Sequence, residues 1–155
     1  MTDYNFTTVW KLTAPLEMVW KEINEPQDWP LWWKGVEKVT ELQPGDKLGV
    51  GSVKRFTWKS KLPYRLSFDS RVTVVEPMSR IEGVAFGELD GKGVWTFTFE
   101  NGYTLARYDW MVKTTKPWMN LLAPIARPAF EWNHNVIMNW GGVGLAKRLR
   151  CELVE

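Results

Sequence analysis

The chain is poor in the residue types that most often form metal and nucleophilic sites. Its 155 residues include a single histidine, His134, and a single cysteine, Cys151. A lone cysteine excludes an internal disulfide, and we expect a reducing, cytoplasmic location. The two residues lie far apart along one predicted helix, which argues against a Cys–His pair and against a metal site. The sequence also lacks the phosphate-loop, dinucleotide and serine-elbow motifs, so we expect neither a metal nor a cofactor.

Strong charge and long apolar runs are also absent. The formal net charge is +2 and the basic residues are scattered along the chain, which argues against a nucleic-acid partner. No apolar run has the length of a membrane-spanning helix, and the first residues lack the basic and apolar regions of a signal peptide. No repeat, low-complexity segment or linker divides the sequence, so residues 1–155 are predicted to form a single domain.

Tryptophan, in contrast, is abundant, with 11 residues in the sequence. Indole combines a large apolar body with one hydrogen-bond donor, so it suits pocket walls and interfaces as well as cores. Trp29, Trp32 and Trp33 stand with Leu31 in one short turn, which cannot bury all four side chains on one side. We expect some of these rings either to pack in the core, or to lie at a cavity mouth or in a partner interface.

The first part of the chain predicts one strand and two short helical segments. Residues 3–12 are rich in aromatic and β-branched types, which favours a strand. Apolar residues at helical spacing then run from Leu16 to Ile23, and Pro26 ends this helix. Residues 26–35 hold the tryptophan-rich turn.

Residues 35–115 alternate between apolar and polar types with a period of two. Turn signals separate the alternating segments, among them Asp90-Gly91 and Asn101-Gly102. Together with the first strand, these segments predict an antiparallel meander of about seven strands. The predicted fold class is therefore α+β.

The alternation places most strand aromatics on one face of this sheet. In the segment from Pro63 to Glu76, Val72 and Val74 share that face with Phe68. The face carries more aromatic surface than the two short helices could cover, so we expect the C-terminal helix to cover the rest. The predicted aromatic face contains Trp58, Tyr64, Phe68, Trp95, Tyr108 and Trp110.

The C-terminal helix is predicted to be regular from about Pro128 onward, with a kink or break at the prolines. Phe130 and Ile137 lie on its apolar side, and Asn133 and His134 fall within the same side. A buried polar group without a partner costs about 1–3 kcal/mol. These two side chains are therefore expected either to bond a strand or to present donors and acceptors to a molecule in a cavity. The glycines at 141, 142 and 144 indicate a close approach to another element or a local bend.

This order of elements resembles the START/polyketide cyclase-like (SRPBCC) superfamily, which has the helix-grip fold. The resemblance implies a curved antiparallel sheet wrapped around the long C-terminal helix, with a deep apolar cavity between them. It also implies lipids, polyketides or aromatic molecules as ligands, and an entrance near Trp32 and Trp33. The segments that carry it are APLEMVW (14–20), WPLWWKGV (29–36), GSVKRFTWKSKLPYRL (51–66), GELDGKGVW (87–95), RPAFEWNHNVIM (127–138) and GLAKRL (144–149).

Three classes of function remain open at this stage. The leading prediction is a protein that binds a hydrophobic small molecule without chemistry. The second is a cyclase or dehydratase in which His134, the only side chain that titrates near neutrality, acts as general acid and base. The third is a protein-interaction module built on Trp29–Trp33; the oligomeric state is left open. The residues expected to bind the ligand are Trp33, Trp58, Tyr64, Phe68, Trp95, Tyr108, Trp110, Phe130, Asn133, His134 and Ile137.

Overall fold

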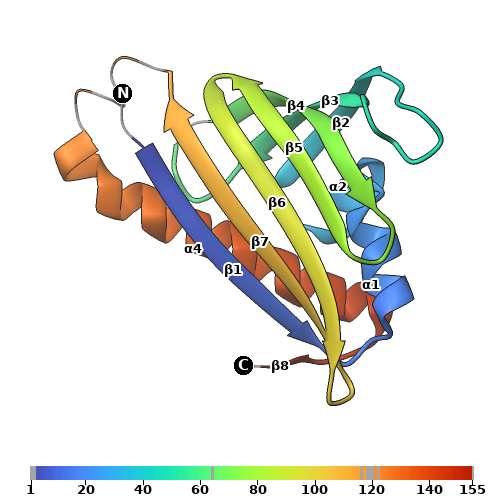
Figure 1. The fold of residues 1–155 in the computed structure, drawn as a ribbon. Helices are drawn as coiled ribbons and strands as arrows, with labels where there is room; N and C mark the ends of the chain where they lie inside the picture. Colours follow the sequence, from blue (N-terminus) through green and yellow to red (C-terminus); the bar gives the residue numbers. More distant parts are fainter. Residues whose placement is uncertain (1–2, 64, 116, 118–120, 122, 155) are drawn as a thin grey trace.

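The protein folds into one antiparallel sheet that curves around a long helix (Figure 1). The computed structural model describes residues 3–63, 65–115, 117, 121 and 123–154. The elements are β1 (Asp3–Leu12), α1 (Leu16–Ile23), η1 (Pro26–Asp28), α2 (Trp29–Trp32), β2 (Val36–Gln43), β3 (Val53–Lys59), β4 (Arg65–Glu76), β5 (Arg80–Gly87), β6 (Leu89–Glu100), β7 (Tyr103–Thr114), α4 (Ala123–Leu149) and β8 (Leu153–Val154).

The sheet confirms the predicted helix-grip architecture. Its strands lie in the order β2-β3-β4-β5-β6-β7-β1-β8, so the chain runs as a meander from β2 to β7 and β1 closes against β7. The eighth strand, β8, adds two residues beside β1. It was not predicted, because Leu153–Val154 is too short to show an alternating pattern.

Helix α4 lies across the concave side of the sheet (Figure 1). It begins at Ala123 and passes through Pro128 as one helix, so the predicted break at Pro128 is wrong. A proline inside a helix removes one backbone hydrogen bond. The loss is tolerated here because it falls in the first turns, and the following turns pack against strands and α2.

Two local predictions about the strands are also wrong. The register of β4 against β5 shifts between Val72 and Val74, and this irregularity reverses the alternation. As a result Val75, only 8% exposed, joins the core in place of Val74. Asp90-Gly91 is not a turn, because both residues lie in β6 and pair with Lys113 and Val112 of β7.

Tryptophans fix the C-terminal half of α4 to the rest of the core. The indole N–H of Trp33 donates to the backbone oxygen of Ile137 at 2.9 Å, and that of Trp10 donates to the oxygen of Met138 at 3.0 Å. The glycines of α4 allow Trp10 and α2 to lie this close to the helix. A Cβ on Gly141 would lie 2.7 Å from an atom of the Trp10 ring, and a Cβ on Gly144 would overlap the backbone oxygen of Trp32. The glycines thus serve close packing against α2 and β1.

Candidate ligand cavity

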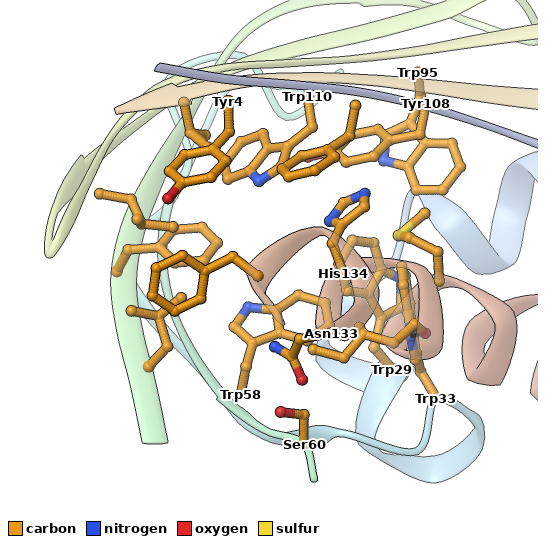
Figure 2. A pocket seen from close by; sticks show the side chains of 18 residues that line it. Tyr4, Trp29, Trp33, Trp58, Ser60, Trp95, Tyr108, Trp110, Asn133 and His134 are labelled. Atoms are coloured by element: carbon orange, nitrogen blue, oxygen red, sulfur yellow. Dashed lines mark hydrogen bonds between the residues drawn. The ribbon is translucent and has the colours of Figure 1, made fainter. Parts of the chain in front are cut away.

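A cavity of about 140 Å³ lies between the concave face of the sheet and the first half of α4. Figure 2 shows the strand aromatics Tyr4, Trp95, Tyr108 and Trp110 on one side of it, and His134 pointing toward them from the helix. A space of roughly 150 Å³ holds a benzene-sized ring. The lining residues are Tyr4, Phe6, Trp29, Trp33, Trp58, Ser60, Leu66, Phe68, Leu89, Trp95, Tyr108, Trp110, Val112, Phe130, Asn133, His134, Ile137 and Met138.

The structure brings together ten of the eleven residues that the sequence predicted for this site. The eleventh, Tyr64, lies outside the described residues. The ten that line the cavity are Trp33, Trp58, Phe68, Trp95, Tyr108, Trp110, Phe130, Asn133, His134 and Ile137.

The expected position of the tryptophan-rich turn at an entrance is wrong. Trp33 is only 2% exposed and forms an inner wall of the cavity with Trp29, while Trp32 packs in the core. The fourth apolar side chain of the turn, Leu31, is not buried, since it is 71% exposed. The three rings are therefore buried and offer no surface for docking a partner.

Tyr4 and Phe6 are the main lining residues that sequence reasoning missed. Both point to the concave face from β1, where the alternation Tyr4, Phe6, Thr8, Trp10 carries the signal that could have found them. Leu66 and Leu89 could have been found in the same way. Ser60 follows β3 in a loop, and no periodic pattern could predict its orientation.

Contacts between aromatic rings hold the walls in place. The centroids of Trp95 and Tyr108 are 4.5 Å apart, and Trp33 meets Trp58 edge-on at 5.3 Å. From the helix, the imidazole of His134 stacks on Phe6 of β1 with the centroids 4.1 Å apart. Such contacts fix the orientation of each ring. The cavity is therefore largely preformed.

Four polar atoms around this cavity are buried without a hydrogen-bond partner among the residues that the structure describes. They are the Tyr4 hydroxyl, Trp58 Nε1, Asn133 Oδ1 and His134 Nε2. The expectation that Asn133 and His134 bond a strand fails for these two atoms. Buried polar atoms in native proteins are nearly always paired, so a group of four in one cavity needs an explanation.

Burial also sets the charge of the cavity. It lowers the pKa of His134 from 6.5 to about 4, so the imidazole is neutral at pH 7. It raises the pKa of Tyr108 and of Tyr4, which keeps both hydroxyls protonated. The cavity therefore presents neutral donors and acceptors to its contents.

A second cavity of about 430 Å³ adjoins the first. Trp29, Trp58, Phe68, Trp95, Tyr108 and Trp110 line both, so the two spaces share a wall of aromatic rings. The second cavity extends toward η1 and the loop between β2 and β3.

Comparison with known proteins agrees with this geometry. Residues 12–137 match the family described as Polyketide cyclase / dehydrase and lipid transport. The chain belongs to this family. No curated protein sequence matches the chain significantly.

Solved structures share the fold at low sequence identity. A protein of Thermus thermophilus superposes with a TM-score of 0.76 at 14% identity, covering 94% of this chain and 99% of that one. A START superfamily protein of Mycobacterium smegmatis gives 0.75 at 13% identity, covering 94% and 97%. The Zhui aromatase/cyclase of a Streptomyces species gives 0.69 at 14% identity, covering 95% and 96%. This family member thus shares the fold with START proteins and aromatase/cyclases.

Two absences hold among the described residues. Among them, no group of three or more His, Cys, Asp or Glu side chains is placed to hold a metal ion. In the same part of the chain, no helix has the length and apolar character that a bilayer span needs.

Proposed function

We propose that the protein binds an apolar, ring-containing small molecule that carries hydroxyl or carbonyl groups, in the cavity between α4 and the sheet. The observation that carries this proposal is the set of four unpartnered polar atoms in an aromatic cavity. Ligand sites are typically apolar spaces with a few placed polar groups. The family and the START neighbours support a small hydrophobic ligand of this kind.

Energetics favour a ligand with oxygen atoms over a pure hydrocarbon. Each buried polar atom without a partner costs about 1–3 kcal/mol. A hydrocarbon would fill the space and leave that cost in place. A hydroxyl or carbonyl group that bonds these atoms removes part of it, so the free energy of binding becomes more favourable.

The four atoms have distinct roles in such a complex. Trp58 Nε1 carries a hydrogen and donates to a carbonyl oxygen of the ligand. Asn133 Oδ1 accepts from a ligand hydroxyl, and the Tyr4 hydroxyl does either. His134 is neutral, so its Nε2 bonds a ligand hydroxyl, while stacking on Phe6 fixes the ring.

The binding proposal is tested with two probes of the same ring size, 2-naphthol and naphthalene, whose second ring would extend into the adjoining cavity. Trp29, Trp33, Trp58, Trp95 and Trp110 line the cavity, so the intrinsic fluorescence reports occupancy. We expect 2-naphthol to bind about tenfold or more tightly than naphthalene, because only the naphthol offers a hydroxyl.

The control for this experiment is a polar residue on the same helix that does not line the cavity. Replacing His134 by Phe should remove most of the preference for 2-naphthol, while replacing the exposed Asn135 by Ala should keep it. Equal affinities of the two probes for the wild-type protein, or no binding of either, would contradict the proposal.

A second candidate function, cyclisation of a polyketone, is favoured by the free Nε2 of His134. In its neutral form this nitrogen takes a proton from the carbon beside a carbonyl group. The resulting enolate carbon attacks a second carbonyl of the same molecule and forms a carbon–carbon bond. The new alkoxide recovers the proton from the imidazolium, and loss of one water gives the ring. Neighbours named as aromatase/cyclases support this alternative.

Heptane-2,4,6-trione is a suitable probe, because its aldol cyclisation with loss of one water gives 5-methylresorcinol. The enzyme hypothesis predicts that absorbance of the aromatic product appears faster with wild-type protein than with the His134→Gln variant. Equal rates for the two proteins at full occupancy would restrict the protein to binding. The melting temperature of the variant shows that the comparison is between folded proteins.

A further inference from the structure

The concave face of the sheet changes from aromatic to polar along β3. Phe56 and Trp58 point inward, and Lys54 has the same position in the alternation. Phe56 pairs with Phe68 of β4, and two residues earlier in β3, Lys54 pairs with Ser70. The lysine therefore lies two residues, roughly 7 Å, from the aromatic row. It lines the second cavity.

The Lys54 ammonium has few partners in the protein. Its Nζ donates to the Ser52 hydroxyl at 2.6 Å, and among the described residues it forms no ion pair. Burial of the side chain lowers its pKa, and the charge of Glu41, its cross-strand partner on β2, raises it. An ammonium has three donors. At least one donor therefore remains for a molecule in the cavity.

Two of the acidic side chains around the second cavity, Asp46 and Glu82, are already engaged. The Asp46 carboxylate accepts the backbone N–H groups of Leu48 and Val50, which closes its own loop. Glu82 is paired with Arg80 and Lys92. Of the two lysines in the described lining, Lys47 is exposed and Lys54 is half-buried, so Lys54 is the more enclosed cation of this cavity.

The second cavity shares a wall of aromatic rings with the first. Gly83 of β5 and Gly93 of β6 pair with each other and line it, so no side chain rises from these two positions. Trp58, Phe68 and Trp110 line both spaces. A ligand that reached past these rings would have its ring system among the aromatics and its other end beside Lys54.

We propose that the ligand of this cavity is amphipathic and acidic, with a carboxylate held by Lys54 in the second cavity. The inference rests on the proposed function, since it assigns the other end of the same ligand. A carboxylate accepts charge-assisted hydrogen bonds from the ammonium, which are shorter and stronger than neutral ones. The hydroxyl of Ser70, opposite Lys54, offers a second donor.

The test compares 6-(2-naphthyl)hexanoic acid with its methyl ester, which differ in charge but share the ring and the chain. Tryptophan fluorescence gives both dissociation constants. For wild-type protein at pH 7 we expect the acid to bind about tenfold or more tightly than the ester. In Lys54→Met, which keeps the length of the stem, the ratio should fall to about one. Lys54→Arg keeps the charge and should retain a preference for the acid.

Lys38→Met is the matched control, because Lys38 is an exposed lysine of β2 that does not line the cavity. It should keep the wild-type ratio. Equal binding of acid and ester to the wild-type protein, or an unchanged ratio in Lys54→Met, would overturn the inference and leave the proposed function standing. Failure of both probes to bind would overturn both. A melting curve of each variant establishes that it is folded.

Discussion

The two halves of α4 lie on either side of the backbone carbonyls of Ile137 and Met138 and differ in how they meet the protein. After Met138 the helix is packed as tightly as its glycines allow, with indole donors on both carbonyls and α2 against Gly144. Before Ile137 the helix faces a cavity and leaves polar atoms of Asn133 and His134 without partners. One helix thus has a tightly packed C-terminal half and an N-terminal half that lines a cavity.

This difference separates residues that hold the fold from residues that contact the ligand in the proposed function. In the tightly packed half, the two backbone carbonyls that face the core have indole partners, so a substitution that disturbs them should lower stability. In the cavity-facing half, the unpaired groups cost free energy. Substitutions there should leave stability unchanged or raise it, while they weaken binding. Four predictions test this contrast.

The largest effect is expected at Gly144. A Cβ at this position overlaps the backbone oxygen of Trp32, so Gly144→Ala must push α2 away from α4. We expect a loss of about 3 kcal/mol in the free energy of unfolding, measured by urea denaturation. The exposed Asn139→Ala, on the same helix, should change stability by less than about 0.5 kcal/mol. A gain in the free energy of unfolding for Gly144→Ala, as expected in an exposed helix, would show that Gly144 does not hold α2 close to α4.

The next effect compares two tryptophans. Trp33→Phe removes a donor that is bonded to Ile137 and should cost about 2–3 kcal/mol. Trp58→Phe removes an N–H that has no partner and should cost less than about 1 kcal/mol. Thermal or urea unfolding of both variants gives the comparison, and equal losses would contradict it.

The third prediction concerns pH. The pKa of His134 is about 4 in the folded protein and near 6.5 in the unfolded chain, so the unfolded state binds the proton more tightly. The free energy of unfolding should therefore fall as the pH drops from 6.5 toward 4, by about 2 kcal/mol between pH 7 and pH 5. In His134→Phe this part of the loss should disappear. An identical pH dependence in both proteins would show that the imidazole is not buried in neutral form.

The smallest effect is expected at Asn133. Replacing it by Leu removes a buried oxygen that has no partner, and should raise the free energy of unfolding by about 1 kcal/mol. The same change should weaken binding of 2-naphthol about fivefold. Lower stability with unchanged affinity would give Asn133 a structural role instead.

Much of this architecture could be predicted from the sequence because it rests on periodicity. The alternation of residues 35–115 predicts the meander, and helical spacing places Asn133 and His134 on the side of α4 that faces it. The errors come from features that have no period. The register shift after Val72 is a local change in pairing, and it moved Val75 rather than Val74 into the core.

The cavity itself could be predicted only in part. The family resemblance implied that Trp32 and Trp33 lie near an entrance, while the crowding of four large side chains in one turn left core packing and a cavity mouth both open. The structure buries the tryptophans and exposes Leu31, which depends on how closely α2 approaches Gly144. The absence of partners for His134 Nε2 and Trp58 Nε1 is likewise a property of the assembled walls. It could not be read from any single segment.

The ring ¹⁵N chemical shifts of His134 show most directly whether the unpaired polar atoms of α4 bind a ligand. The protein has one histidine, and its Nε2 is one of these atoms. Saturation with 2-naphthol should shift the Nε2 resonance as this nitrogen gains a hydrogen-bond partner, and naphthalene should shift it much less. An Nε2 resonance that does not move at saturation with 2-naphthol would contradict the assignment of this half of α4 to ligand binding.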